Sequence, residues 1–220
     1  LAACFFHDQP DYIAAVTGTN GKTSVVDFVR QMWIASGYNA ASLGTLGLKD
    51  RNALELSGLT TPDTVKLHKT LKSLCDSQVD YLALEASSHG LDQFRIDGVK
   101  ISVAAFTNLT QDHLDYHKNL KNYLNAKLYL FKNLIQKRGN VITDQLIPEF
   151  KKIKKITINK KLKLHTLNNK KNNLELLSHN FKGEGQFLRV KLNSSIKDLN
   201  LNLIGKIQLK NVLMAIIAAK

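Results

Sequence analysis

Cysteine is scarce in this chain, and its hydrophobic runs are short. The two cysteines, Cys4 and Cys75, lie far apart and belong to no metal-binding or redox motif. A reducing, cytoplasmic setting is therefore expected. No apolar run approaches the length of a membrane span, and the first residues lack the basic-then-apolar order of a signal peptide. The sequence predicts no membrane partner.

Acidic residues are missing from one long stretch of a basic chain. The formal net charge is +13, and nine lysines fall between Lys151 and Lys171, with no acid between Glu149 and Glu175. One interpretation is a nucleic-acid surface. A solvated edge is favoured, because Phe and Tyr are not interleaved with the lysines to stack on bases. Nucleic acid is not expected as a partner.

Length and composition suit one sizeable globular α/β core. The chain has 220 residues, of which 44% are hydrophobic and 22% charged. It begins at Leu1 rather than at methionine, and it ends at Lys220 inside an apolar helical pattern. We therefore expect it to be a piece of a longer protein.

Short apolar runs alternate with helical patterns along the first 150 residues. Strands are expected at 13–16, 40–48, 79–86, 101–106 and 140–143. Helices are expected from Lys22 to a stop at Gly37, over 63–76 and over 119–137. This alternation predicts a doubly wound, mostly parallel α/β sheet that gathers ligands at the carboxyl ends of its strands.

The pattern changes near residue 150. Strand-like segments at 155–159, 164–167, 174–178, 186–192 and 199–204 predict a small, partly antiparallel sheet, and 209–219 returns to a helical pattern. The expected organisation is a parallel core over 1–150, a β-rich extension over 151–204 and a closing helix over 205–220. No internal repeat or long linker separates these parts.

Residues 17–24, Thr-Gly-Thr-Asn-Gly-Lys-Thr-Ser, stand between the first strand and the first long helix. Glycines let backbone N–H groups approach phosphate oxygens, the helix N-terminus adds partial positive charge, and the Thr23 hydroxyl can reach a magnesium ion. Val16 replaces the first glycine of the usual P-loop spacing, so this loop is a shorter form. It indicates a site for ATP or GTP phosphates.

Polar motifs follow two more of the expected strands. Glu85 ends an apolar run and precedes Ser-Ser-His-Gly-Leu-Asp-Gln-Phe-Arg, and a carboxylate beside a phosphate loop is where the magnesium of a nucleotide is held. His113 and His117 have the i, i+4 spacing of zinc ligands, but no glutamate follows His113, so magnesium is favoured. Thr61, before Pro62, is favoured as a helix N-cap.

Lys127 falls on or beside an apolar stripe of the helix expected over 119–137. From the residues alone, we expect its stem to cover apolar surface while its ammonium reaches water.

In order, the motifs TGTNGKTS, TTPD, EASSHGLDQFR, FTNLTQDHLDYH, NAKLYLF and GKIQLKN resemble the central domain of the Mur ligases. SSHGLDQ-x-R with DHLDYH is similar in particular to the MurE type. The resemblance implies ATP-dependent amide formation for peptidoglycan, in which phosphate passes from ATP to a substrate carboxylate and an amine attacks the acyl phosphate. The substrates would be UDP-MurNAc-L-Ala-D-Glu and meso-diaminopimelate or L-lysine.

The resemblance also implies roles for individual residues. Lys22, His113 and Lys127 would be catalytic, with Lys127 carried as a carbamate. Magnesium would be bound by Thr23, Glu85, His113 and the Lys127 carbamate. ATP would be held by Gly18, Thr19, Asn20, Gly21, Lys22, Thr23, Ser24 and, at the adenine, Asn211. The UDP-muramoyl-dipeptide would be bound by Thr60, Thr61, Ser87, Gln93 and Arg95.

The family has a uridine-binding N-terminal domain and a closing C-terminal domain, and this chain matches neither. We therefore expect the chain, as a monomer, to bind ATP weakly and to have little ligase activity. Two alternatives remain open. One is another Mur ligase or a folylpolyglutamate-type ligase, against which the motif at 85–95 argues. The other is a non-catalytic remnant that binds nucleic acid through the lysine stretch.

Overall fold

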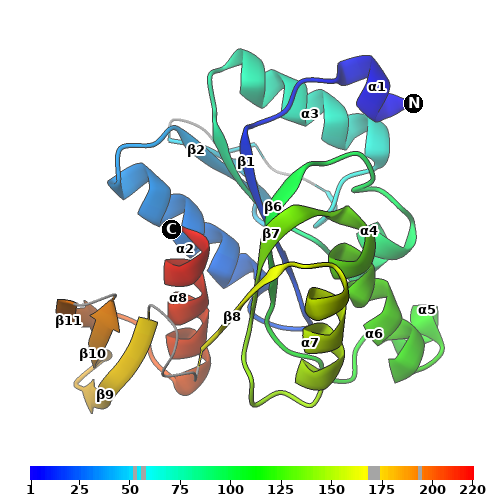
Figure 1. Ribbon diagram of the computed structural model, residues 1–220. Helices are drawn as coiled ribbons and strands as arrows, with labels where there is room; N and C mark the ends of the chain where they lie inside the picture. Colours follow the sequence, from blue (N-terminus) through cyan, green and yellow to red (C-terminus); the bar gives the residue numbers. More distant parts are fainter. Residues whose placement is uncertain (52–53, 56–57, 168–173, 193–194) are drawn as a thin grey trace.

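The computed structural model describes residues 1–51, 54–55, 58–167, 174–192 and 195–220 (Figure 1). Two sheets are present in these residues, one with eight strands in the order β4-β3-β2-β5-β1-β6-β7-β8 and one with three strands in the order β11-β10-β9. In the large sheet, the strands from β2 to β8 in this order pair in parallel. The predicted fold class, a mostly parallel α/β sheet with a small antiparallel sheet, is confirmed.

The parallel strands are β1 (Tyr12–Thr17), β2 (Ala40–Gly44), β5 (Tyr81–Glu85), β6 (Ile101–Phe106), β7 (Ile135–Thr143) and β8 (Lys163–Thr166). β3 (Gly47–Lys49) and β4 (Leu54–Glu55) add an antiparallel edge. The small sheet consists of β9 (Leu174–Lys182), β10 (Gly185–Leu192) and β11 (Ser195–Leu201).

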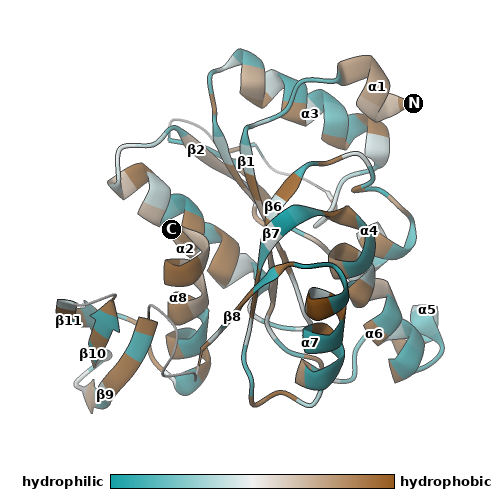
Figure 2. Cartoon of the chain, viewed as in Figure 1, coloured by the Kyte–Doolittle hydropathy of each residue, from teal (hydrophilic) through white to brown (hydrophobic). Residues whose placement is uncertain are grey.

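Helices cover both faces of the large sheet. In β1, Ile13 and Ala15 face one apolar cluster and Ala14 and Val16 face the other, and none of the four is more than 1% exposed. A strand buried on both faces reads as a continuous apolar run, which is how β1 was predicted. Figure 2 shows this hydrophobic colouring along the central strands.

The first cluster lies under α3 (Thr64–Asp76), α4 (Ser88–Asp92), α6 (Leu120–Tyr129) and α7 (Phe150–Asn159). The second lies under α2 (Lys22–Ala35) and α8 (Lys206–Ala218), and the small sheet adds Leu188 and Val190 to it. Two short helices, α1 (Ala2–Phe6) and α5 (Leu114–His117), complete the described helices, with a π-helical turn at Leu130–Leu134. No described helix is both long and apolar enough to cross a membrane.

Several expected boundaries are wrong. The strand expected at 155–159 is the second half of α7, in which Ile153, Ile156 and Thr157 turn inward at helical spacing and the lysines turn outward. The segment expected as a strand at 164–167 is β8, which pairs with β7 in the large sheet. The part of the chain that forms the small sheet therefore begins at β9, and residues 151–166 continue the parallel core.

Two other elements are shorter than expected. The run at 40–48 folds into a hairpin of β2 and β3, because Thr45 and Leu46 form its turn. The helix expected over 119–137 ends in the π turn, and β7 begins at Ile135. The expected N-cap at Thr61 is also wrong, because the Asp63 carboxylate caps α3 by accepting a hydrogen bond from the backbone N–H of Lys66 at 3.0 Å.

Candidate active site

The glycine loop follows β1 at the centre of the sheet, where neighbouring connections leave in opposite directions. Gly21 precedes the first turn of α2 with φ +85°, a conformation that favours glycine, and a Cβ there would lie 2.6 Å from the Asn211 side-chain oxygen. Asn211 is 3% exposed and donates to Gln208 at 3.2 Å. The expected nucleotide contact Asn211 therefore lies directly against the loop.

Residues that follow β6 hold the loop in place. The backbone N–H of Thr19 donates to the Asn108 carbonyl at 2.9 Å, and that of Asn20 donates to the Asn108 side chain at 3.0 Å. The Thr107 hydroxyl donates to the Asn20 carbonyl at 2.6 Å, and the Thr110 N–H donates to the Thr19 hydroxyl at 3.0 Å. The loop is thus braced from both sides by a segment about ninety positions away.

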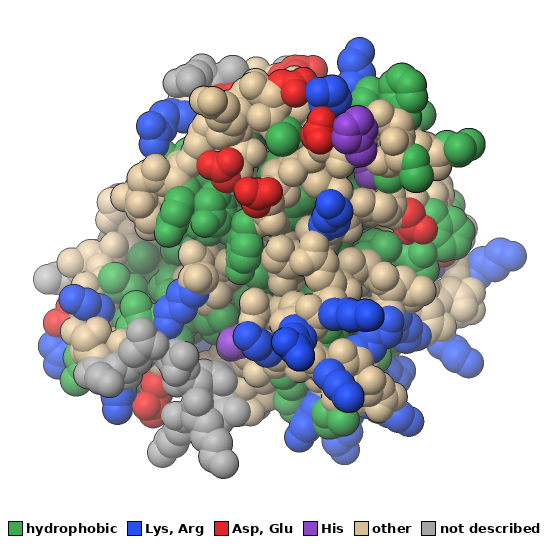
Figure 3. Space-filling view, turned by 45° about the horizontal axis from the view of Figure 1, so that its top comes forward, with side chains coloured by type: hydrophobic (Ala, Val, Ile, Leu, Met, Phe, Trp, Pro, Cys, Tyr) green, Lys and Arg blue, Asp and Glu red, His purple; other side chains and the backbone are tan. Residues whose placement is uncertain are grey.

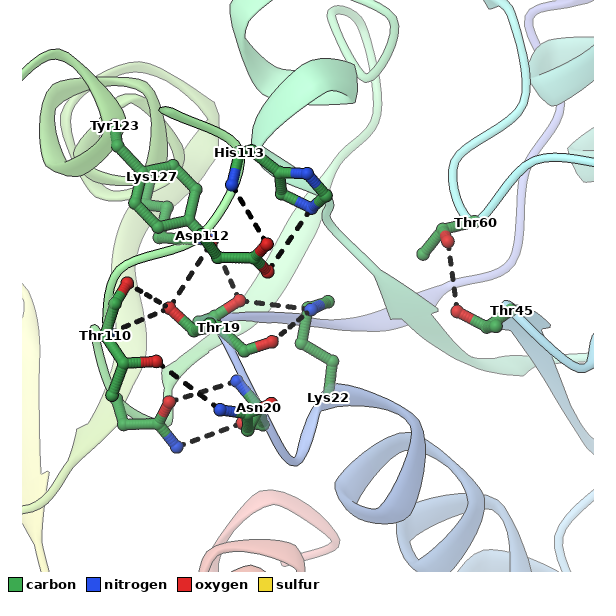
Figure 4. Close-up of polar contacts among 12 residues, drawn as sticks. Thr19, Asn20, Lys22, Thr45, Thr60, Thr110, Asp112, His113, Tyr123 and Lys127 are labelled. Atoms are coloured by element: carbon green, nitrogen blue, oxygen red, sulfur yellow. Dashed lines mark hydrogen bonds and ion pairs between the residues drawn. The ribbon is translucent and has the colours of Figure 1, made fainter. Parts of the chain in front are cut away.

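Two lysine ammonium groups point into the loop (Figure 4). Lys22 Nζ donates to the carbonyl oxygens of Gly18 and Thr19, and Lys127 Nζ donates to the Gly18 carbonyl at 2.8 Å. Lys127 is 1% exposed, so the expectation that its ammonium reaches water is wrong. Burial, reinforced by the charge of Lys22, lowers the pKa of Lys127 to about 7. Burial also lowers the pKa of Lys22, against the opposing charges of Glu85 and Asp112.

Tyr123 on α6 joins the loop to Lys127. Its hydroxyl donates to the Thr19 hydroxyl at 3.2 Å, and Lys127 Nζ lies 4.2 Å from the centre of its ring. The ring is 1% exposed, and burial raises the pKa of its hydroxyl. Sequence reasoning missed Tyr123. Its signal was a hydroxyl-bearing aromatic one helical turn before Lys127, on the same face of the helix.

Glu85, at the end of β5, is 1% exposed and is bound by Thr45. Its carboxylate accepts the Thr45 backbone N–H at 2.8 Å and the Thr45 hydroxyl at 3.2 Å. A Cβ at Gly44 would lie 2.2 Å from this carboxylate, so the close approach requires glycine. Within the described ranges, no Lys or Arg forms an ion pair with Glu85, and a buried carboxylate whose hydrogen bonds come from a neutral residue is suited to a cation.

Of the residues expected to bind substrate, Thr61, Ser87 and Arg95 are joined to one another by hydrogen bonds beside Glu85, whereas Gln93 lies at the surface. Thr61 is buried; its hydroxyl donates to the Glu85 carbonyl at 2.8 Å and accepts the Ser87 N–H at 3.0 Å. Arg95 Nη1 donates to the Thr61 carbonyl at 2.8 Å. Gln93, in contrast, is exposed and directs its side-chain oxygen at the Arg95 guanidinium.

Three histidines pack together beside the loop. The His89 ring lies 4.8 Å from His113 and 5.5 Å from His117, centre to centre. Burial lowers the pKa of both His89 and His117. His113 stands before α5 with φ +52° rather than inside a helix, so the helix face assumed for a zinc pair is not formed. The described residues contain no group of three or more His, Cys, Asp or Glu suited to a metal ion.

The candidate site contains one cavity of about 340 Å³. The predicted residues that line it are Lys22, Thr23, Thr60, Thr61, Glu85, Ser87, Arg95, His113 and Lys127. Thr45, Ser88, His89 and Tyr123 also line it and were not predicted. The predicted residues that do not line it are Gly18, Thr19, Asn20, Gly21, Ser24, Gln93 and Asn211. Thr45 and Thr60 face each other across the cavity from Lys22, with 3.0 Å between their hydroxyl oxygens (Figure 4).

A glycine loop at the carboxyl end of a central parallel strand, with lysines and a buried carboxylate beside it, is the arrangement typical of nucleotide-phosphate sites in doubly wound α/β folds. The profile of one family, the Mur ligase middle domain, matches residues 16–219. This chain belongs to that family.

Curated relatives share much of the sequence. The chain is 41% identical over 224 residues to the UDP-N-acetylmuramoyl-L-alanyl-D-glutamate--2,6-diaminopimelate ligase of Anaplasma marginale, covering 100% of this chain and 47% of the relative. It is 42% identical over 220 residues to the ligase of the same name from Caulobacter vibrioides, with 97% and 45% covered. The chain thus spans about half the length of these relatives.

Solved structures agree on the fold. A UDP-N-acetylmuramoyl-L-alanyl-D-glutamate--2,6-diaminopimelate ligase matches with a TM-score of 0.87 and 27% identity, covering 99% of this chain and 44% of that one. A folylpolyglutamate synthetase in complex with AMPPCP matches with a TM-score of 0.76, 17% identity and coverages of 99% and 60%, and this match shows the fold alone.

Proposed function

We propose that this chain is the ATP-binding part of a ligase that adds meso-diaminopimelate to UDP-MurNAc-L-Ala-D-Glu in peptidoglycan synthesis. The observation that carries the proposal is that Lys22, Glu85, His113, Lys127 and Arg95 all border one cavity. The names of the relatives support diaminopimelate over L-lysine as the added amino acid.

In this proposal, the N–H groups at the start of α2 and the Lys22 ammonium bind the β- and γ-phosphates of ATP. Lys22 exchanges its bonds to the Gly18 and Thr19 carbonyls for phosphate oxygens. The substrate carboxylate attacks the γ-phosphorus, a P–O bond forms and the bond to ADP breaks. The amine then attacks the acyl phosphate, phosphate leaves, and the amide forms with loss of a proton. Positioning and charge neutralisation supply most of the catalysis.

A magnesium ion fits the donors present. Glu85 is a buried carboxylate that forms no close ion pair with a Lys or Arg in the described chain, and Thr23 borders the same cavity. One or two protein oxygens shared with nucleotide phosphates are the usual set for magnesium, whereas a cage of three or more protein ligands is not needed. Bound there with His113, the ion would neutralise developing phosphate charge.

Lys127 fits the role of a carbamate. A pKa of about 7 leaves a substantial fraction of its amine neutral near neutral pH, and only the neutral amine can attack CO₂. In that reaction an N–C bond forms and the neutral amine releases one proton to become an anion; counted from the ammonium form, two protons are released and a cation becomes an anion. Because Lys127 Nζ lies 2.8 Å from the Gly18 carbonyl oxygen, a carbamate on this nitrogen would have to turn its charged oxygens away from that carbonyl, toward the cavity.

Arg95, Thr60, Thr61 and Ser87, which border the same cavity, would hold the UDP-muramoyl-dipeptide, since a guanidinium and hydroxyls match carboxylate and phosphate oxygens. A cytoplasmic location and a monomeric state remain part of this proposal; dependence on ATP supports the first.

Nucleotide binding tests the proposal directly. Calorimetric titration of the chain with AMPPNP and MgCl₂ should give binding that Lys22→Ala weakens at least about tenfold, because a charge-assisted bond is lost. Lys132→Ala, at an exposed lysine, is the matched control. Equal binding by both variants contradicts the proposal. The ligase step is tested on the chain joined to its flanking coding sequence, as phosphate release that requires both UDP-MurNAc-L-Ala-D-Glu and meso-diaminopimelate.

A further inference from the structure

Gln93 was expected to contact substrate, yet it stands behind Arg95 rather than at the cavity. Its Oε1 accepts from Arg95 Nε at 2.9 Å and also from Nη2. With the bond from Nη1 to the Thr61 carbonyl, three of the five guanidinium N–H groups are used within the described chain. The two N–H groups left, one on each terminal nitrogen, are available for a ligand at the cavity.

The orientation of the Gln93 amide decides whether it can hold Arg95. A side-chain amide has an acceptor end and a donor end, and only the acceptor end suits a guanidinium. Reversed by 180°, the amide would place its NH₂ group against the Arg95 N–H groups. Something must therefore set the direction of this amide.

Tyr116 sets that direction. Gln93 Nε2 donates to the Tyr116 hydroxyl oxygen at 3.1 Å, and the hydroxyl donates its proton to the Asp92 carboxylate at 3.0 Å. A hydroxyl has only one proton to donate, so its bond to Asp92 leaves only acceptor lone pairs for Gln93. The amide NH₂ must then face Tyr116, and the amide oxygen must face Arg95.

The source of this order lies outside the active-site cavity. Asp92 and Tyr116 line a neighbouring cavity of about 560 Å³ between α4, α5 and α6, and neither borders the active-site cavity. The Tyr116 ring is fixed by His89 at 4.3 Å and His117 at 4.7 Å, centre to centre. Figure 1 shows α4 and α5 beside α6, so two sequence motifs meet at this tyrosine.

We propose that Tyr116 and Asp92 are positioning residues that fix the Gln93 amide and, through it, aim the Arg95 guanidinium at the substrate. The hydrogen-bond chain runs in one direction, from the Arg95 donors through Gln93 and Tyr116 to the Asp92 carboxylate. The identity of the ligand of Arg95, the anionic part of a UDP-muramoyl-dipeptide, rests on the proposed function. The positioning role of Tyr116 and Asp92 does not rest on the proposed function.

The first test is NMR of the ¹⁵N-labelled chain. Tyr116→Phe should shift the Gln93 side-chain amide and Arg95 Nε–H signals and speed exchange of the Arg95 proton with water. Tyr129→Phe is the matched control, because Tyr129 lines the same neighbouring cavity but donates to Asp97. Asp92→Ala frees the hydroxyl to reverse, so it should shift the same signals with Tyr116 intact. Unchanged Gln93 and Arg95 signals in both Tyr116→Phe and Asp92→Ala overturn the proposal.

The second test is binding. Tyr116→Phe should weaken binding of UDP-MurNAc-L-Ala-D-Glu by about 3- to 10-fold, the effect of one hydrogen bond, and leave AMPPNP affinity within about twofold. Equal weakening by Tyr129→Phe, or a parallel loss of AMPPNP binding, would indicate general destabilisation and overturn the role. If the unaltered chain binds no dipeptide, the proposed substrate is wrong, and the NMR test still decides the positioning.

Discussion

Lys22 and Lys127 donate to the same carbonyl oxygen, that of Gly18, at 3.1 and 2.8 Å. Burial lowers the pKa of both lysines, and the charge of Lys22 lowers that of Lys127 further, because two like charges in a buried site disfavour each other. Without an anion, the loop carbonyls accept hydrogen bonds from both ammonium groups. A phosphate bound to Lys22 would reduce the repulsion between Lys22 and Lys127, and a negative group on Lys127 would remove it.

Stability should rise with pH because of Lys127. Its pKa is about 7 in the folded chain and near the ordinary lysine value of 10.5 in the unfolded chain, so the unfolded chain binds more protons between these values. Below pH 7 the loss of folding stability caused by burying a protonated Lys127 is fully present, and this loss disappears as the pH approaches 10.5. Urea unfolding at pH 7.5 and 8.5 should give a gain of up to about 1 kcal/mol for the unaltered chain relative to Lys127→Met. Identical pH slopes in both proteins would refute the low pKa.

Tyr123 should contribute separately through its hydroxyl and through its ring. Tyr123→Phe removes the bond to Thr19 but keeps the face under Lys127, and should cost about 1 kcal/mol in urea unfolding. Tyr123→Leu also removes the aromatic face and should cost about 2 kcal/mol or more. If both variants lose the same amount, the ring contact with Lys127 contributes nothing.

Gly21 and Gly37 form a matched pair, since both have φ near +90°. Gly37→Ala has no atom within 4 Å of the added Cβ and should cost only the backbone penalty of about 1–2 kcal/mol. Gly21→Ala adds a clash with Asn211, so it should cost more and reduce AMPPNP affinity in the titration described above. Equal unfolding costs for the two variants would mean that Asn211 moves aside freely.

The lysines of α7 should not serve the site. Figure 3 shows Lys and Arg side chains gathered on the part of the surface where α7 lies in Figure 1. Lys151, Lys152, Lys154 and Lys155 are all exposed. Changing these four to Gln should leave AMPPNP binding unchanged and shift stability by less than about 0.5 kcal/mol. Duplex DNA binding with a steep salt dependence, retained in Lys22→Ala and lost in the fourfold variant, would instead support the nucleic-acid alternative.

Local sequence patterns correctly predicted the elements whose structure depends on residues close together in the chain. The β1 run, the glycine loop and the start of α2 are continuous in sequence, and their structure follows from apolar burial and glycine placement. The segment 155–159 was misread, because a few alternating Ile and Thr residues fit a strand as well as one face of a helix. Only packing of Ile153 against the sheet decides between them.

The parts of the site that escaped prediction depend on contacts between distant segments. The hydrogen bond of Lys127 could not be predicted, because its acceptor, the Gly18 carbonyl, is 109 positions away in the sequence. Gln93 resembles a substrate ligand in the sequence, and only the hydroxyl of Tyr116 indicates that the amide acts through Arg95. Thr45 follows no motif, and its role appears once β2 and β5 lie side by side.

The bracing of the glycine loop by residues after β6 limits how far the loop can be treated as a portable motif. Thr17 pairs with Phe106, and this register brings Thr107, Asn108 and Thr110 beside the loop. The eight residues 17–24, moved alone into another protein, would lose the hydrogen bonds that residues 107–110 make to them. The smallest transferable unit is therefore two adjacent strand ends, and a search for such sites by the loop sequence alone overlooks the second segment that gives the loop its shape.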